Sequence, residues 1–210
     1  ELAYGLPGAG PAPDVTVGGN VRLDRGSLLL GGWAQGAQTR LAAAGDLTLD
    51  NGSYLYVYAG ETSAAVTNGG VVRFLGDARL GNGCWVCPHT QATNGGNVLF
   101  SFGDLAISAN AGFNADAAGY MSNAGGGTLP GTGGGNNGGG GGGHGGRGGT
   151  GFYAAVGGSA FGSSNAPTSA GGGGGAGLAS GFRSDYIYWI SMGGGSIQIE
   201  ADDGQRVRHD

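Results

Sequence analysis

The sequence predicts an all-β protein: a right-handed parallel β-helix that carries a glycine-rich insertion. Three observations predict it: a repeat bounded by glycine, apolar alternation within each repeat, and 54 glycines among 210 residues. Alternation over a few positions between Gly, Asn and Asp is typical of short strands, and glycine throughout the chain disfavours helix. We therefore expect a single β-helix domain over residues 1–210, with the insertion at residues 120–183.

The repeat consists of four segments at intervals of about 25–26 residues. They are GNVRLDRGSLLL from Gly19, GDLTLDNGSYLY from Gly45, GVVRFLGDARL from Gly70 and GNVLFSFGDLAI from Gly96. Each begins with Gly, continues apolar-x-apolar and reaches a turn glycine before a second apolar burst. A constant period fits a parallel β-helix, in which each period is one coil and coils stack about 4.8 Å apart. A β-sandwich is the competing fold, but its hairpins require no constant period.

The insertion contains GTGGGNNGGGGGGHGGRGGTG at residues 131–151. Glycine-rich runs usually serve as flexible linkers. However, His144, Arg147 and Thr150 lie three residues apart with Gly-Gly between them, and a polyproline-II-type helix has three residues per turn. We therefore expect an ordered, polyglycine-II-like segment packed on the side of the β-helix, with these three side chains on one ridge. Its bare glycine faces could approach another backbone closely.

Charge argues against several classes of partner. All nine basic residues are Arg, the net charge is −5, and no basic cluster exists. Nucleic acid is not expected as a partner, because phosphate neutralisation needs clustered cations. No apolar run approaches the roughly 18 residues of a membrane span. Strand-like alternation is still under way in GGGSIQIEADDGQRVRHD, so we expect the chain to be a piece of a longer polypeptide.

The sharpest local motif is CWVCPH at residues 84–89. Pro88 separates His89 from the second cysteine, which does not match covalent haem attachment. A tetrahedral zinc site needs four ligands, and the motif supplies three. Redox CxxC sites begin a helix, which is not predicted here. We expect a disulfide between Cys84 and Cys87 that closes a coil turn, with a metal site as the second interpretation and redox chemistry as the third.

Tyr54, Tyr56 and Tyr58 alternate along one predicted strand and so share one face. This face could stack sugars or cover a polyglycine layer, and packing is the interpretation we favour. Asp24 and Asp50 occupy equivalent repeat positions and could stack as a short ladder, for which turn chemistry is the favoured interpretation and a weak Ca²⁺ site the alternative. Aspartates that follow a corner glycine serve turn geometry, so neither a metal nor another cofactor is expected. No nucleophile–His–Asp set or carboxylate pair is present, so we assign no catalytic residue and expect no enzyme.

Four segments carry a resemblance to a known kind of protein. They are GDLAISANAGFNADAAGY (103–120), GGGGGGHGGRGG (138–149), FGSSNAPTSAGGGGG (161–175) and GGGSIQIEADD (193–203). Together they resemble large glycine-rich surface proteins of environmental bacteria, similar in style to secreted parallel β-helix adhesins. The resemblance spans roughly residues 100–203. It implies an extracellular, cell-surface location, a structural or adhesive role and a longer parent chain, and it supplies no catalytic residues.

These features predict a structural subunit or repeat domain of an extracellular fibre, sheath or surface adhesin. Open strand edges recruit further strands, so we expect coils of neighbouring copies or repeats to stack at an edge formed by Ile197, Ile199 and Val207. The alternative is a carbohydrate-binding adhesin module that uses the three tyrosines and takes a polysaccharide as its partner. A polysaccharide lyase is a third reading, supported only by analogy of fold.

Overall fold

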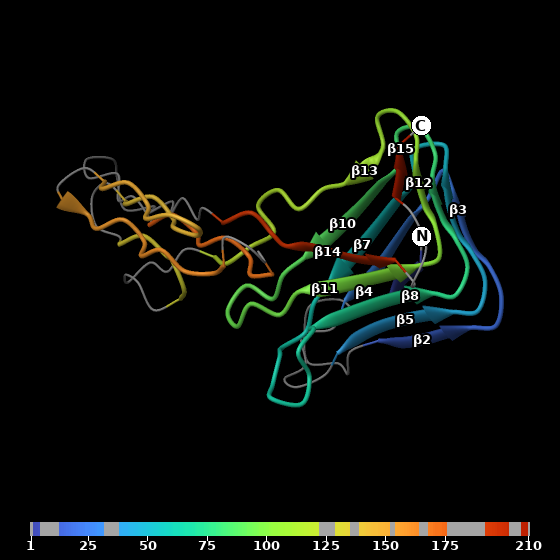
Figure 1. The fold of residues 1–210 in the computed structure, drawn as a ribbon, viewed down its shortest axis with the longest axis horizontal. Helices are drawn as coiled ribbons and strands as arrows, with labels where there is room; N and C mark the ends of the chain where they lie inside the picture. The colour runs from blue at the N-terminus through green and yellow to red at the C-terminus, as the bar shows by residue number, and fades with distance from the viewer. Residues whose placement is uncertain are drawn as a thin grey trace. The chain divides into compact units, whose positions relative to one another are not determined.

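The alternating segments form fifteen short strands in three parallel sheets (Figure 1). The computed structural model describes residues 2–4, 13–31, 38–121, 129–134, 139–151, 154–163, 168–175, 192–201 and 207–209. Within them there is no α-helix. The chain divides into two compact units: the first comprises Glu1–His89, Gly96–Asn114 and Ile197–Asp210, and the second Thr90–Gly95 and Ala115–Ser196.

All fifteen strands belong to the first unit, and each sheet contains five of them. Sheet A consists of β1 (Leu2–Tyr4), β4 (Ser27–Gly31), β7 (Tyr54–Tyr58), β10 (Trp85–His89) and β13 (Gly112–Phe113). Sheet B consists of β2 (Asp14–Val17), β5 (Thr39–Ala43), β8 (Gly70–Phe74), β11 (Val98–Phe102) and β14 (Ile197–Ala201). Sheet C consists of β3 (Val21–Asp24), β6 (Leu47–Asp50), β9 (Ala78–Leu80), β12 (Leu105–Ile107) and β15 (Val207–His209).

The chain visits the sheets in the fixed order B, C, A. Strands β2, β3 and β4 form one coil, and β5, β6 and β7 lie in register on them in the next. Every strand therefore pairs in parallel with the strand that occupies the same position one coil away. This arrangement confirms the predicted all-β fold and its parallel β-helix.

The predicted constant period is wrong. Leu47 pairs with Val21, 26 positions earlier, and with Ala78, 31 positions later. The aligned segments from Gly19 and Gly45 run through sheets C and A, whereas those from Gly70 and Gly96 run through sheets B and C. Glycine followed by apolar alternation occurs at more than one corner of the coil, so the alignment joined two different corners.

Length differences between coils are concentrated at one corner. The connections from sheet B to sheet C are residues 18–20, 44–46, 75–77 and 103–104, and those from C to A are 25–26, 51–53, 81–84 and 108–111. The connections from A to B are 5–13, 32–38, 59–69, 90–97 and 114–196. The glycine-rich insertion is therefore one greatly lengthened A-to-B corner, between β13 and β14.

Inward side chains of the three sheets form one continuous core. In sheet B, Leu41, Val72 and Phe100 are neighbours in register and are almost fully buried. The Phe100 ring packs edge-on against Phe113, with ring centroids 5.2 Å apart. The apolar-x-apolar pairs that define the predicted strands, such as Leu47 and Leu49, point into this core.

An asparagine–aspartate ladder holds the B-to-C corner. The Asn20 Oδ1 atom accepts a hydrogen bond from the Asp46 amide (2.9 Å), the Asp46 Oδ1 atom from the Asp77 amide (3.0 Å), and the Asp77 Oδ1 atom from the Asp104 amide (2.8 Å). A Cβ atom on Gly45 would overlap the Asn20 side chain of the neighbouring coil. The Gly-Asp pairs at this corner are therefore explained by close stacking, and these carboxylates serve the geometry of the coil.

In the second unit, glycine segments hydrogen-bond to one another through their backbones. The Gly140 amide donates to the Gly134 carbonyl (3.0 Å) and the Gly143 amide to the Gly131 carbonyl (2.7 Å). On another side of the same segment, the carbonyls of Gly140 and Gly143 accept hydrogen bonds from the amides of residues 175 and 172, at 2.7 and 3.1 Å. Bonds to each neighbour recur every three residues, which is the period of a polyglycine-II helix.

His144, Arg147 and Thr150 do not share one ridge. The Gly141 amide donates to the Gly149 carbonyl (2.8 Å), so the backbone reverses between these two glycines. His144 lies in that bend, and Arg147 and Thr150 follow it. The recurrence of backbone bonds every three residues lies in residues 131–134, 139–143 and 172–175, whereas the chain turns back within residues 144–150 and so builds no continuous ridge there.

Aromatic side chains anchor the second unit. The His144 ring lies edge-on to Phe161 with centroids 5.1 Å apart, and Phe161 in turn contacts Tyr120 at 5.9 Å. A Cβ atom on Gly131 would overlap the Phe161 ring. The few large side chains of this unit therefore pack directly on bare glycine backbone.

Candidate functional site

The outer face of sheet A carries the predicted tyrosine face. Leu55 and Val57 of β7 are fully buried in the core, so the alternation of the strand places Tyr54, Tyr56 and Tyr58 on the opposite side. All three tyrosines are partly exposed. The structure therefore brings the three predicted residues together on one outward surface.

Strand β10 extends this surface with three further side chains. Trp85, Cys87 and His89 are the register partners of Tyr54, Tyr56 and Tyr58, in that order. We call the six residues the aromatic face. The sequence analysis did not place His89 on this face, because a 31-residue offset separates His89 from Tyr58. His89 can be assigned to this face only from the register between β7 and β10.

The rings of the aromatic face stack on one another. Tyr54 and Tyr56 are nearly parallel, with centroids 5.8 Å apart and planes at 9°. His89 stacks closely on Tyr58, at 4.3 Å and 5°, and lies 6.4 Å from Tyr56. Parallel offset rings of this kind stabilise the sheet by about 0.5–1.5 kcal/mol per pair beyond the burial of area.

Four groups of the aromatic face have pKa values shifted in the direction that favours their uncharged forms. Burial raises the pKa of Tyr56, and the neighbouring Cys87 raises it further. The same two causes raise the pKa of Tyr58, and burial alone raises the pKa of the Cys87 thiol. Burial lowers the pKa of His89. The face therefore offers uncharged rings and hydroxyl groups, which suit contact with a neutral surface such as a sugar ring or a backbone.

The predicted disulfide between Cys84 and Cys87 is absent, because both residues are free cysteines. Residues three apart in an extended strand point to opposite faces. Cys84 belongs to the buried core, where its sulfur accepts a hydrogen bond from the Ser53 amide at 3.3 Å. Cys87 lies on the outer side with Tyr56. The thiols serve as packing groups, and among the described residues no group of three or more His, Cys, Asp or Glu is placed to hold a metal ion.

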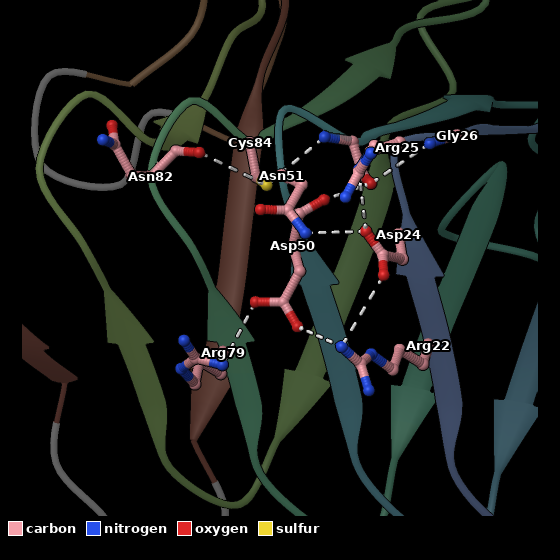
Figure 2. A network of polar contacts seen from close by, with 10 residues as sticks. Arg22, Asp24, Arg25, Gly26, Asp50, Asn51, Arg79, Asn82 and Cys84 are labelled. Carbon is pink, nitrogen blue, oxygen red and sulfur yellow. Dashed lines mark hydrogen bonds and ion pairs between the residues drawn. The ribbon is translucent and has the colours of Figure 1, made fainter.

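Sheet C carries a network of arginines and aspartates on its outer face (Figure 2). Asp24 and Asp50 are register neighbours, as their equivalent repeat positions suggested. The Asp50 carboxylate lies 3.2 Å from both Arg22 and Arg79, and Arg22 also approaches Asp24 at 3.8 Å. Because guanidinium groups pair with both aspartates, the ladder is an ion-pair network.

The predicted assembly edge lies at one end of the stack. Ile197 and Ile199 belong to β14, which pairs with β11, and Val207 belongs to β15, which pairs with β12. Ile199 packs partly on the core, whereas Ile197 is 42% exposed. Among the strands that the structure describes, none lies beyond β14 or β15.

Comparison of this chain with protein-family models, curated proteins and solved structures finds no match. In the described part of the chain, no helix is long and apolar enough to cross a membrane. A parallel β-helix is compatible with many functions. The residues of the aromatic face and of the β14 edge are therefore the features that bear on function.

Proposed function

We propose that this chain is a structural subunit or repeat domain of an extracellular fibre, sheath or surface adhesin, which assembles by coil-on-coil stacking of β-helix ends. The observation that carries the proposal is the open end of the apolar core at β14. Ile197 continues an inward row of sheet B through Gly70 and Val98. Val98 is 1% exposed, whereas Ile197 is 42% exposed.

The edge of β14 offers both backbone and apolar groups to a partner. A strand paired on one side presents unpaired amide and carbonyl groups on the other, and these recruit another strand. Full burial of an isoleucine side chain contributes about 1.5–3 kcal/mol, so covering the exposed part of Ile197 contributes about 1 kcal/mol. Stable stacking therefore needs the edges of more than one sheet together, and assembly should depend steeply on concentration.

The opposite end of the stack is apolar in the corresponding positions. Val15 and Val17 of β2 are inward residues that remain only partly buried. Stacking β14 of one copy on β2 of another joins two different surfaces. Such a head-to-tail contact repeats without closing, which produces filaments or a continuous array of repeats.

The extracellular, cell-surface location belongs to the same proposal. It is supported by the resemblance of residues 100–203 to glycine-rich bacterial surface proteins. The partners in this proposal are further copies of the chain or neighbouring repeats of a longer parent. No catalytic role or cofactor forms part of it.

The test replaces Ile197 by lysine and measures assembly by sedimentation velocity and electron microscopy over a range of protein concentrations. A charge at the open end of the core should abolish polymers, because it cannot be buried against a second coil. Leu75→Lys is the matched control, since Leu75 is 61% exposed and lies away from this end. Removal of residues 194–210 should have the same effect as Ile197→Lys. Unchanged filaments in Ile197→Lys, or a protein that stays monomeric without any substitution, would refute end stacking.

A second candidate function is carbohydrate binding by an adhesin module through the aromatic face. Its specific support is the parallel, outward-facing pair Tyr54 and Tyr56. Exposed aromatic faces can stack on the apolar side of a sugar ring. A glycan array probed with the wild type and with Tyr54→Ala and Tyr56→Ala should show glycans bound only by the wild type. The close stack of His89 on Tyr58 supports the competing packing role, which predicts no glycan signal.

A further inference from the structure

Sheet B has a hollow on its outer face where small residues follow one another. Thr16, Ala42 and Arg73 form one outward row across β2, β5 and β8. Ala44 and Leu75, which directly follow β5 and β8, line the same hollow. Small side chains on β5 between larger ones on its neighbours leave a depression that the sequence pattern alone did not indicate. Its volume is about 340 Å³.

The floor and walls of the hollow differ in character. Ala42 and Ala44 provide an apolar floor, and the exposed Leu75 stands beside it. Arg40, Arg73 and the Thr16 hydroxyl provide polar groups around the rim. An apolar base with a few convergent polar groups is the usual composition of a small-molecule site, and the volume lies in the usual range of roughly 300–1,000 Å³.

The two arginines of the hollow are in different electrostatic situations. The Arg40 guanidinium forms an ion pair with Asp14, with 3.2 Å between nitrogen and oxygen. The Arg73 guanidinium has no hydrogen bond or ion pair with another described residue. Arg22, Arg25 and Arg79 of the same unit each contact an aspartate. Among the residues that the structure describes, the hollow therefore contains one positive charge without an ion-pair partner.

We propose that this hollow binds a carboxylate-bearing ligand of monosaccharide size, an acidic sugar being the chemistry that fits it. The planar Arg73 guanidinium can donate two parallel hydrogen bonds to a carboxylate. The C–H face of a sugar ring can lie on Ala42 and Ala44, and its hydroxyl groups can reach the Thr16 hydroxyl. This site is separate from the β14 edge and from the aromatic face, so it does not depend on the proposed function.

The test is an NMR titration of the protein with D-glucuronate, followed through the alanine methyl signals and the Arg73 Nε–H signal. Glucuronate should shift the signals of Ala42, Ala44 and Arg73 in a saturable manner. D-Glucose, which lacks the carboxylate, and acetate, which lacks the ring, should each bind at least about tenfold more weakly, because each loses one of the two kinds of contact.

Three variants make the result specific to the hollow. Arg73→Gln should weaken glucuronate binding at least about tenfold, since it removes the charge-assisted pair. Ala44→Leu should abolish binding by filling the hollow, and Ala44 is exposed, so this change is compatible with folding. Arg147→Gln removes an exposed positive charge from the other unit and should leave binding unchanged.

Several results would overturn the proposal. They are the absence of any saturable shift with glucuronate, equal binding by glucose, and equal binding by the wild type and Arg73→Gln. Equal affinity for acetate would overturn the monosaccharide size, because the alanine floor would then contribute nothing.

Discussion

The order of the polyglycine segments can be tested by adding a single methyl group. A Cβ atom on Gly142 would overlap the carbonyl oxygen of Gly172. Accommodating it requires residues 171–175 to move away from residues 140–143. That movement breaks the two backbone hydrogen bonds that the amides of Gly172 and Gly175 donate, at 3.1 and 2.7 Å.

The expected loss follows from these contacts. Each backbone hydrogen bond contributes about 0.5–1.5 kcal/mol net, so Gly142→Ala should destabilise the second unit by about 1–3 kcal/mol. Gly149→Ala is the matched control, because no atom lies within 4 Å of its added Cβ. In a flexible linker both substitutions would have the same small effect. A glycine-to-alanine change without strain stabilises by only about 0.4–1 kcal/mol, through the unfolded chain.

Hydrogen exchange measured by mass spectrometry provides the readout. Peptides from residues 139–151 and 168–175 should be protected in the wild type and in Gly149→Ala. In Gly142→Ala their amides should exchange about five to 150 times faster, the factor that corresponds to 1–3 kcal/mol. If these peptides exchange at the unprotected rate in the wild type, or equally in both variants, the ordered polyglycine bundle does not exist.

Four further predictions concern the β-helix unit. Phe100→Ala should lower the free energy of unfolding by about 3–5 kcal/mol in a denaturant titration, because Phe100 is fully buried, whereas the exposed Leu75→Ala should change it little. Asp46→Ala should cost about 1 kcal/mol by removing an acceptor of the corner ladder, while Asp46→Asn, which keeps the acceptor, should cost much less; equal losses would show that the ladder bond is unimportant. Burial lowers the pKa of His89, so below about pH 6.5 the unfolded chain takes up a proton before the folded chain does. The free energy of unfolding should therefore fall as the pH drops from 7.5 to 5.5, by at most about 1.4 kcal/mol per pH unit relative to His89→Phe. Parallel curves of stability against pH for the wild type and His89→Phe would contradict this. Reducing agent should leave the melting temperature unchanged, and both cysteines should react with a thiol reagent only after denaturation; a thiol count of zero in denaturant would restore the disulfide.

Local alternation carried enough information to predict the strands and their inward residues. The apolar-x-apolar alternation of the repeat segments includes Leu47, Leu49, Val72 and Phe100, and all four are buried in the core. The sheet of the coil to which each segment belongs could not be predicted in the same way. Glycine stands at every corner of the coil, as Gly45 from B to C, Gly52 from C to A and Gly96 from A to B, so a one-dimensional alignment cannot tell one corner from another.

The candidate sites show the same difference between what alternation within one strand predicts and what depends on the pairing of strands. The shared face of the tyrosines follows from alternation within one strand, whereas His89 joins it only through the register between strands. The disulfide prediction failed because spacing was considered without strand geometry, which directs Cys84 inward and Cys87 outward. Pairing among glycine segments carries no side-chain signal at all. Which amide meets which carbonyl is decided by tertiary packing.

The corner from sheet A to sheet B accepts connections of very different length, so the chain can gain residues there without a change in the geometry of the core. Replacing a connection like residues 90–97 by one like 114–196 lengthens it by just over three doublings, and the added closure entropy is only about 2 kcal/mol. The strands on either side keep the same partners whatever lies between them. A foreign domain grafted at residues 59–69 should therefore leave the stack intact, and the β-helix can serve as a modular scaffold that accepts one cargo per coil at a fixed position.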